Sequence, residues 1–321
     1  MRQWRPPNLL KRPVVAIGRL GYGQMAVLEE PRLTLAAAVV FLNEGDLLPR
    51  MLKTLARQTR PPELLLLVDD GSEDHSGALA AAFAREHPYA RLLERPRRAP
   101  SGDRLAQAAE LTAFQWALEQ LEEQCDVVAK LDADLELPTD FFARIMSALE
   151  SNPQLGIAGA QLTAPGAVAV PEYSQPWHVR GATKFYRVSC WEAIAPLPPI
   201  LGWDTIDETR AAMSGWDVRT VPFGDDKPLH LRPTGTYDGA VRGYRRRGAA
   251  AWGYGAHPLN VLASALVRMR HRPRLLGGLA YLGGWLGAVL QRAPRAEPPA
   301  RRYLQREQLR RLQAALRRGA S

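Results

Sequence analysis

The stretch LTLAAAVVFLNEGDLLPRMLKTLARQ, residues 33–58, places an almost wholly apolar run before a helical pattern. The apolar side chains that recur on one face of the expected helix are Leu48, Met51, Leu52 and Leu55. Asp46 is placed to cap this helix, and Pro49 suits its first turn. Because uninterrupted aliphatic residues are typical of a strand covered on both faces, the stretch predicts a buried strand followed by a helix.

The same order repeats further along the chain. PPELLLLVDDGSEDHSG, residues 61–77, has the pattern of a second buried strand, a turn, and a helix from about Ser76. Thr139 is expected to cap a later helix, which follows the fourth strand. The elements expected in between are a strand at 90–96, a long helix at about 103–124 and a strand at 125–134. Alternating strands and helices predict an α/β fold, with a mostly parallel sheet and helices on both faces.

Polar residues follow three of the expected strands. They are Asn43 and Glu44, Asp69 and Asp70, and Asp132 and Asp134. In parallel α/β sheets, ligands bind beyond the carboxyl ends of the strands, so these residues predict one shared site. The alternative is a set of ordinary turns, since Asp, Asn, Gly and Ser are also the residues that turns favour.

The carboxylates of Asp132, Asp134 and Glu136 stand two residues apart, directly after an apolar run. In extended backbone they share one face, where like charges repel and raise each other's pKa. A divalent cation resolves that conflict, and hard oxygen ligands suit Mg²⁺ or Mn²⁺. Glu136 is equally well explained as a surface residue.

Composition limits the remaining classes of protein. The chain has 321 residues, of which 46% are hydrophobic and 23% charged, as in ordinary globular proteins. Its two cysteines, Cys125 and Cys190, lack metal-ligand spacing and fit a reducing cytoplasm. Residues 1–33 are expected to form an N-terminal extension, because their apolar stretch is too short for a secretory signal.

Positive charge is concentrated at the C-terminal end. Residues 241–321 contain 17 arginines and two acids, a net charge of +15, whereas the whole chain carries +9. The first 240 residues therefore carry −6, which suggests chemistry in the body and an anionic partner for the tail. No nucleic-acid recognition motif accompanies the arginines, so nucleic acid is not the expected partner.

An uncharged segment, residues 275–290, lies within this basic region. It is short for a membrane span. Flanking arginines suit a helix that lies in the membrane interface, with Tyr281 and Trp285 at headgroup level. The alternative is that these helices pack on the catalytic domain or on a second subunit.

Four segments resemble the family 2 glycosyltransferases, which have the GT-A fold. Residues 41–77 are similar to that family's opening, an N-E pair followed by V-D-D-G-S-x-D, and LDADLELPTDFF at 131–142 resembles its D-x-D element. GATKFYRVSCWEAI at 181–194 resembles the acceptor-side strand and helix. GWDTIDETRAAMSGWDVRTVP at 202–222 occupies the place of the family's G-E-D-x-D segment. The resemblance covers residues 33–222.

The resemblance implies a nucleotide-sugar donor and a role for each matching residue. Asp70 then binds the nucleotide base, Asp132 the ribose or the neighbouring metal shell, and Asp134 the cation. Asn43 and Glu44 are expected at the donor as well.

Further candidate site residues lie outside the matched motifs. His230, after the last sheet strand, is a candidate third metal ligand, as a histidine is in some relatives, or else a loop histidine. Arg104 is expected to approach the diphosphate, with Arg97 and Arg98 nearby.

Transfer to a hydroxyl also needs a base. Asp204 aligns with the family's catalytic aspartate, and family membership implies inversion at the anomeric carbon. The chain departs from the pattern, because Trp203 and Ile206 replace the flanking acids. Asp207 and Glu208 therefore remain alternatives for the same role.

The expected protein is a metal-dependent glycosyltransferase on the inner face of the plasma membrane, acting on a lipid-linked glycan in polysaccharide or glycolipid synthesis. Its expected parts are an N-terminal extension (1–33), a GT-A domain (34–225) and a basic, membrane-associating helical region (226–321). The alternatives are a polyprenyl-phosphate sugar transferase, a nucleotidyltransferase and a non-catalytic protein that binds a membrane or a partner.

Overall fold

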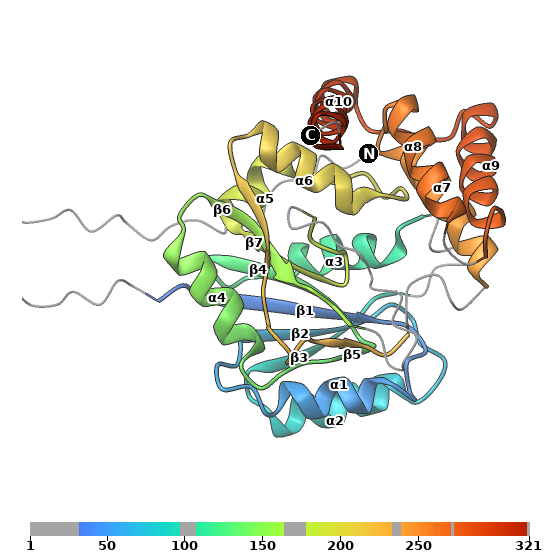
Figure 1. Cartoon of the computed structure of the whole chain (residues 1–321). Helices are drawn as coiled ribbons and strands as arrows, with labels where there is room; N and C mark the ends of the chain where they lie inside the picture. Colours follow the sequence, from blue (N-terminus) through green and yellow to red (C-terminus); the bar gives the residue numbers. More distant parts are fainter. Residues whose placement is uncertain (1–31, 97–106, 164–177, 233–238, 271–272, 320–321) are drawn as a thin grey trace, which may run out of the picture.

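The computed structural model describes residues 32–96, 107–163, 178–232, 239–270 and 273–319 (Figure 1). The expected N-terminal extension lies almost wholly outside these ranges. So do Arg97, Arg98 and Arg104.

A seven-stranded sheet forms the centre of the molecule, with the strand order β3-β2-β1-β4-β7-β6-β8. Its strands are β1 (Leu35–Phe41), β2 (Leu64–Asp69), β3 (Ala90–Glu94), β4 (Val127–Asp132), β6 (Leu155–Ala160), β7 (Thr183–Arg187) and β8 (Asp217–Val221). Neighbouring strands are parallel, except that β7 runs antiparallel to both β4 and β6. The predicted α/β fold with a mostly parallel sheet is confirmed.

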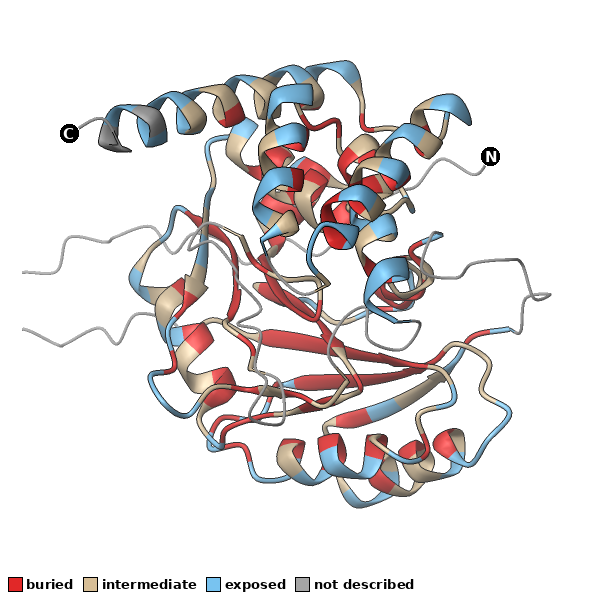
Figure 2. Cartoon of the chain, turned by 45° about the vertical axis from the view of Figure 1, so that its right-hand side comes forward, coloured by how far each residue is buried: buried red, intermediate tan, exposed pale blue. Residues whose placement is uncertain are grey.

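Helices cover both faces of this sheet (Figures 1 and 2). One face packs against α1 (Leu48–Leu55), α2 (Ser76–Glu86) and α4 (Phe141–Ser151). The other face packs against α3 (Ala109–Glu119), α5 (Val188–Ile194) and α6 (Trp203–Met213). Alternate residues of β1 enter the two cores, with Val39 on the first face and Val40 on the second. Burial on both faces explains why the strands are continuously apolar.

Two predicted N-cap residues were wrong, each by one residue. Helix α1 has Leu47 at its N-cap instead of Asp46, because the Glu44 carbonyl oxygen already accepts hydrogen bonds from the next turn. Helix α4 has Asp140 at its N-cap. Thr139 stays outside that helix, and its carbonyl oxygen accepts a hydrogen bond from the amide of Thr59.

The long helix expected at 103–124 is shorter in the structure. Helix α3 spans Ala109–Glu119, while residues 103–106 lie outside the described ranges. Ala108 has a φ of +44°, a left-handed conformation that a right-handed helix does not continue through.

Three further helices share a small core of their own (Figure 1): α7 (Ala240–Gly253), α8 (Pro258–Met269) and α9 (Leu276–Leu290). Helix α10 (Pro298–Gly319) follows them and packs mainly against α6. Tyr281 is only 2% exposed in this core, and Trp285 packs edge-on against Trp252. The prediction that Tyr281 and Trp285 lie at headgroup level was therefore wrong, because both rings pack within the helix group.

Glycines bring α7 and α9 unusually close together. A Cβ on Gly248 would lie 1.8 Å from the Tyr281 carbonyl oxygen, and one on Gly284 would lie 1.9 Å from that of Arg245. Only a residue without a side chain fits at either position. Within the described ranges, no helix combines the length and hydropathy needed to cross a membrane.

Candidate active site

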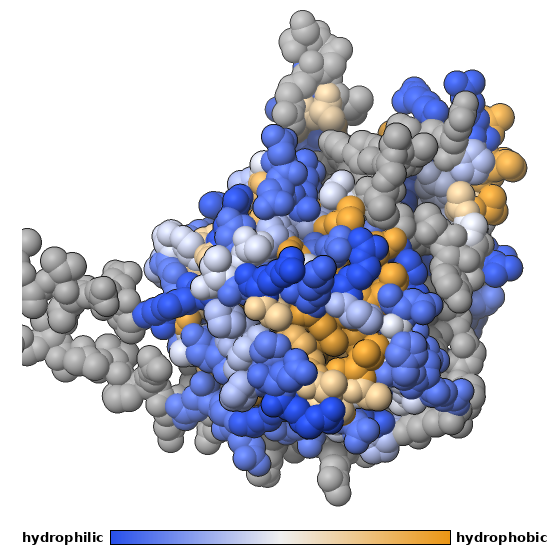
Figure 3. Space-filling model, turned by 90° about the horizontal axis from the view of Figure 1, so that it is seen from below, coloured by the Kyte–Doolittle hydropathy of each residue, from blue (hydrophilic) through white to orange (hydrophobic). Residues whose placement is uncertain are grey.

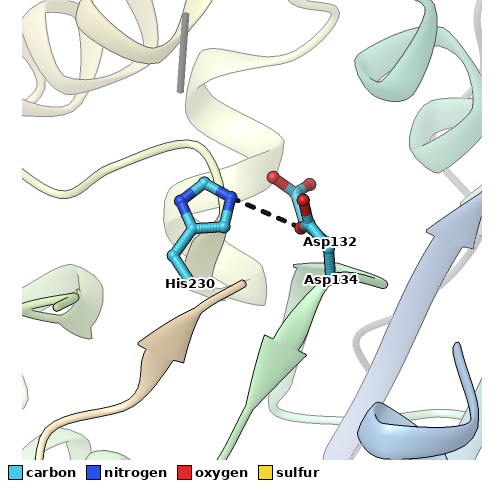
Figure 4. Close-up of side chains that lie close together, drawn as sticks. All are labelled: Asp132, Asp134 and His230. Atoms are coloured by element: carbon cyan, nitrogen blue, oxygen red, sulfur yellow. Dashed lines mark ion pairs between the residues drawn. The ribbon is translucent and has the colours of Figure 1, made fainter. Parts of the chain in front are cut away.

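Three side chains converge beyond the carboxyl end of β4 (Figure 4). Asp132 ends that strand, Asp134 follows it, and His230 comes from the two-residue strand β9 (Leu229–His230). Strand β9 pairs antiparallel with β5 (Leu135–Glu136), which fixes the histidine beside the acids.

The three side chains form a group that can hold a divalent cation. One ligand atom from each residue lies within 4.8 Å of the others, and His230 Nε2 is 3.3 Å from Asp134 Oδ1. Two carboxylates and an imidazole are suitable donors for such an ion.

Protein cations surround the same carboxylates. Lys130 forms an ion pair with Asp132, and Arg232 bridges Glu44 and Asp134. Burial alone would raise the pKa of Asp134, but His230 and Arg232 outweigh it and hold the pKa below its ordinary value. Burial raises the pKa of Glu44. Through Arg232, Glu44 thus lies beside Asp134, and its role at the donor stays a prediction.

Glu136 does not join the group. A bend between β4 and β5 interrupts the alternation that would have placed all three acids on one face. Glu136 pairs instead with Arg50 at 2.8 Å, and both side chains are partly exposed. The expectation of three crowded carboxylates was therefore wrong, because it assumed continuous extended backbone.

The turn after β2 lies beside the loop after β1. Asp69 Oδ1 accepts hydrogen bonds from the amides of Gly71 and Ser72, while Asn43 Oδ1 accepts one from the amide of Glu73 at 2.8 Å. Asn43 therefore holds the turn in place with its side chain.

Asp70 points to a different partner. Its Oδ1 accepts a hydrogen bond from Arg95 Nη1 at 2.7 Å, in a nearly buried pair. Asp70 thus has a fixed orientation at the carboxyl end of β2.

Asp204 lies in the first turn of α6, across Gly181 from the acidic group. A Cβ on Gly181 would lie 3.7 Å from that of Asp204, and the Gly181 carbonyl oxygen accepts a hydrogen bond from Lys130 at 3.0 Å. Lys130 in turn pairs with Asp132. Asp204 is therefore connected to the candidate metal group through contacts of Gly181 and Lys130.

Arg180 adds a positive charge that acts on both Asp204 and Asp132. Burial and the charge of Arg247 lower the pKa of Arg180 to about 10, whereas Asp204 and Asp132 oppose that shift. At neutral pH Arg180 is still charged, and it lies within the electrostatic reach of both aspartates.

The two alternatives to Asp204 are held by other groups. Asp207 is fully buried and accepts hydrogen bonds from Lys184 and from the Tyr186 hydroxyl at 2.6 Å. Glu208 accepts from the amide of Val179 at 2.7 Å and contacts His178 Nδ1 at 3.0 Å. Within the described part of the chain, no group donates a hydrogen bond to the Asp204 carboxylate.

Lys130, Lys184, Arg232 and Arg180 were not predicted. A lysine within an apolar strand, two residues before Asp132, has to pair with a buried acid, and Lys184 lies in a similar position. Arg232 follows His230 by two residues, the spacing of one strand face. The sequence therefore contained a pattern from which Lys130, Lys184 and Arg232 could have been predicted. No pattern around Arg180 indicates a role for it.

Comparisons with known proteins agree with this geometry. A family model described as Glycosyl transferase family 2 matches residues 37–193. Among curated proteins, none matches the chain.

Two solved structures are similar in fold. The mannosyltransferase PcManGT from Pyrobaculum calidifontis, in complex with GDP-Man and Mn²⁺, is 19% identical with a TM-score of 0.52, over 89% of this chain and 80% of that one. GalNAc-T7 with UDP, GalNAc and Mn²⁺ is 13% identical with a TM-score of 0.52, over 83% of this chain and 56% of that one. The protein is therefore a glycosyltransferase with the GT-A fold, and its residues 37–193 match the family 2 model.

Proposed function

We propose that the protein transfers a sugar from a nucleoside-diphosphate sugar to a hydroxyl of a lipid-linked glycan, at the inner face of the plasma membrane. The observation that carries this proposal is the Asp132–Asp134–His230 group, joined through Gly181 to Asp204. The products would enter cell-surface polysaccharide or glycolipid synthesis.

The donor half of the site needs a cation. A nucleoside diphosphate brings negative charge to a carboxylate-lined site, where Mg²⁺ or Mn²⁺ would neutralise it and stabilise the departing diphosphate as a Lewis acid. Asp132, Asp134 and His230 would hold that ion. The similar structures solved with GDP-Man or UDP and with Mn²⁺ support this class of donor.

Asp70 and Arg180 complete the proposed donor contacts. Asp70, oriented by Arg95, is placed at the carboxyl end of β2 to accept a hydrogen bond from the base. Arg180 lies beside Asp132 and would contribute charge toward the diphosphate. We keep Arg104 as a further donor-binding residue, on sequence grounds alone.

Asp204 is the proposed base. Its carboxylate is placed to accept the proton of the acceptor hydroxyl, because the side chain is partly exposed and lies one glycine away from the lysine of the metal group. Asp207 is the weaker alternative because it is enclosed, and Glu208 because its oxygens already accept hydrogen bonds.

Thermal shifts with UDP, GDP, dTDP and CDP test the donor site, each with Mn²⁺ or with EDTA. Ligand at about 100 times its dissociation constant stabilises a fold by about 2.7 kcal/mol, which raises Tm by several degrees. We expect one nucleotide to stabilise the wild type only with metal, and Asp134→Ala to abolish the response.

The matched control is Glu136→Ala, which removes a carboxylate two residues away whose only ion pair among the described residues is with Arg50 on the surface. Its response should equal that of the wild type. Stabilisation that is identical in EDTA, or that survives Asp134→Ala, would refute the metal-bridged donor site.

A further inference from the structure

Helix α9 has its small residues inside and its large aliphatic residues outside. Its buried residues are Gly277, Gly278, Tyr281, Gly284 and Ala288, and its exposed leucines are Leu276, Leu279, Leu286 and Leu290. A surface helix of a soluble protein normally shows the reverse arrangement. Outward leucines therefore indicate a partner, since nothing in the described part of the chain covers them.

Helix α8 extends this surface. Its Leu259, Leu262 and Leu266 recur at helical spacing and are each about half exposed, at 49–56%. The two helices lie in contact, since a Cβ on Gly278 would lie 2.5 Å from the Ala265 carbonyl oxygen. We call the combined surface the leucine ridge: Leu259, Leu262, Leu266, Val267, Leu275, Leu276, Leu279, Leu286 and Leu290.

The leucine ridge contains nine of the eleven exposed large hydrophobic residues in the described ranges, so these residues form one surface. In the view from below, part of this hydrophobic surface is seen at the upper right edge, on the side of α9, apart from the hydrophobic group over the middle of that face (Figure 3).

Charge around the ridge identifies its partner. Residues 240–296 contain ten arginines and neither aspartate nor glutamate. Exposed Arg270, Arg274 and Arg292 lie at the ends of the ridge helices. A second copy of the chain would bring like charges together, whereas an anionic bilayer offers both hydrocarbon and negative headgroups.

We propose that the leucine ridge inserts into the interface of an anionic membrane and that the flanking arginines bind its headgroups. The partner is a lipid surface, and α8 and α9 lie in its plane. This inference extends the proposed function by locating the acceptor, but vesicle binding needs neither donor nor catalysis.

The helices of the leucine ridge are connected by packing to α6, the helix that carries Asp204. Helix α7, which contacts α9 through glycines, packs against the start of α6: a Cβ on Gly253 would lie 2.6 Å from the Leu201 carbonyl oxygen. Gly202, next in the chain, packs against the Tyr254 ring and precedes the helix that carries Asp204. Membrane binding through the ridge would therefore fix the position of Asp204 relative to the lipid surface.

Flotation of the full-length protein with lipid vesicles tests the proposal. Vesicles of phosphatidylcholine with phosphatidylglycerol are compared with phosphatidylcholine alone, at low and high salt. We expect strong binding only to the anionic vesicles, weakened by salt. The double variant Leu279→Glu and Leu286→Glu should bind at least about tenfold more weakly, because two insertion points become anionic.

The control is Met213→Glu, which adds one such negative charge at an exposed apolar residue of α6, outside the ridge. It should float like the wild type. Nucleotide-dependent thermal shifts of each variant show that the donor site is intact, so that loss of flotation is not loss of folding.

Two results would overturn the inference. One is flotation that is absent in the wild type or unchanged in the double leucine variant. The other is a protein that does not bind vesicles and that light scattering shows to be a dimer, if the two leucine substitutions dissociate that dimer. The ridge would then be a subunit interface.

Discussion

Each carboxylate of the candidate donor site pairs with a protein cation. Lys130 serves Asp132, Arg95 serves Asp70, and Arg232 is shared between Glu44 and Asp134. These pairs hold the carboxylates in fixed orientations and compensate their burial, because a buried charge without a partner is costly. A divalent ion at Asp134 would share that carboxylate with Arg232, so the arginine is the residue that must give way or turn toward the phosphates.

Asp204→Asn separates catalysis from binding. The amide keeps the size of the side chain but cannot take a proton, so kcat should fall by about 100- to 10,000-fold. The nucleotide-induced thermal shift should stay at its wild-type value. Initial rates with a hydroxyl acceptor measure the effect.

An unchanged rate in Asp204→Asn would contradict its role as base. With a hydroxyl acceptor, that result would transfer the role of base to Asp207 or Glu208; a polyprenyl-phosphate acceptor, whose anionic oxygen needs no deprotonation, would be indicated only if hydroxyl acceptors gave no rate. Glu208→Gln would then be the next variant to assay.

His178 gives the fold a dependence on alkaline pH. Burial alone would lower the pKa of His178, but Glu208 outweighs it and raises the pKa from 6.5 to about 9. The folded state therefore binds this proton more tightly than the unfolded state, so the stabilisation is complete below pH 6.5 and is lost as pH rises toward 9. Tm of His178→Gln should fall less over that window than Tm of the wild type.

The partner variant checks the cause. Glu208→Gln removes the charge that holds the proton, so it should flatten the same part of the pH curve. If only one of the two variants does so, the His178–Glu208 pair is not the source.

At the scale of elements, glycine decides how α7 and α9 meet. Gly248→Ala or Gly284→Ala would press a methyl group into a backbone carbonyl and should destabilise the fold by about 1–3 kcal/mol. Gly283→Ala, in the same helix but with nothing within 4 Å of its Cβ position, should instead stabilise it by about 0.5–1 kcal/mol.

Urea denaturation of the three variants measures this difference. Equal effects at Gly283 and Gly284 would contradict the close crossing. The comparison isolates helix packing, because helix propensity changes by the same amount at both sites.

The sequence predicted those elements whose signal is local. The strands β1, β2 and β4 are continuous apolar runs, and α1 buries all four residues predicted for its inner face. Asp132, Asp134 and His230 were found because polar residues at strand ends converge in this topology. The convergence of His230 also needed the resemblance, since no local pattern pairs β9 with β5.

The errors share a different cause. Glu136 left the group through one bend, and Tyr281 and Trp285 turned inward because glycines let α9 approach α7. Hydropathy alone does not show which side of a helix rich in both leucine and glycine will be covered. That choice depends on tertiary partners.

At the scale of the whole molecule, both cysteines report on global unfolding. Cys125 and Cys190 are free and lie in the core between the sheet and α3, α5 and α6. Burial raises the pKa of each thiol to about 12, which leaves almost no reactive thiolate in the folded state. Thiol labelling should therefore be slow in the native protein and should accelerate for both cysteines together with denaturant.

An introduced Ser151→Cys, on the exposed end of α4, supplies the comparison. It should label at once in native protein. Fast labelling of Cys190 under the same conditions would contradict its place in the core.

The pairing of β9 with β5 has a consequence for how the protein is made. Strand β5 leaves the ribosome early, whereas His230 follows it by almost a hundred residues. The central sheet has all its strands by Val221, so an unfinished chain can fold that sheet while still lacking the third candidate metal ligand. The nascent polypeptide can therefore complete its candidate cation site only once residues 229–230 have been made, later than every strand of the central sheet.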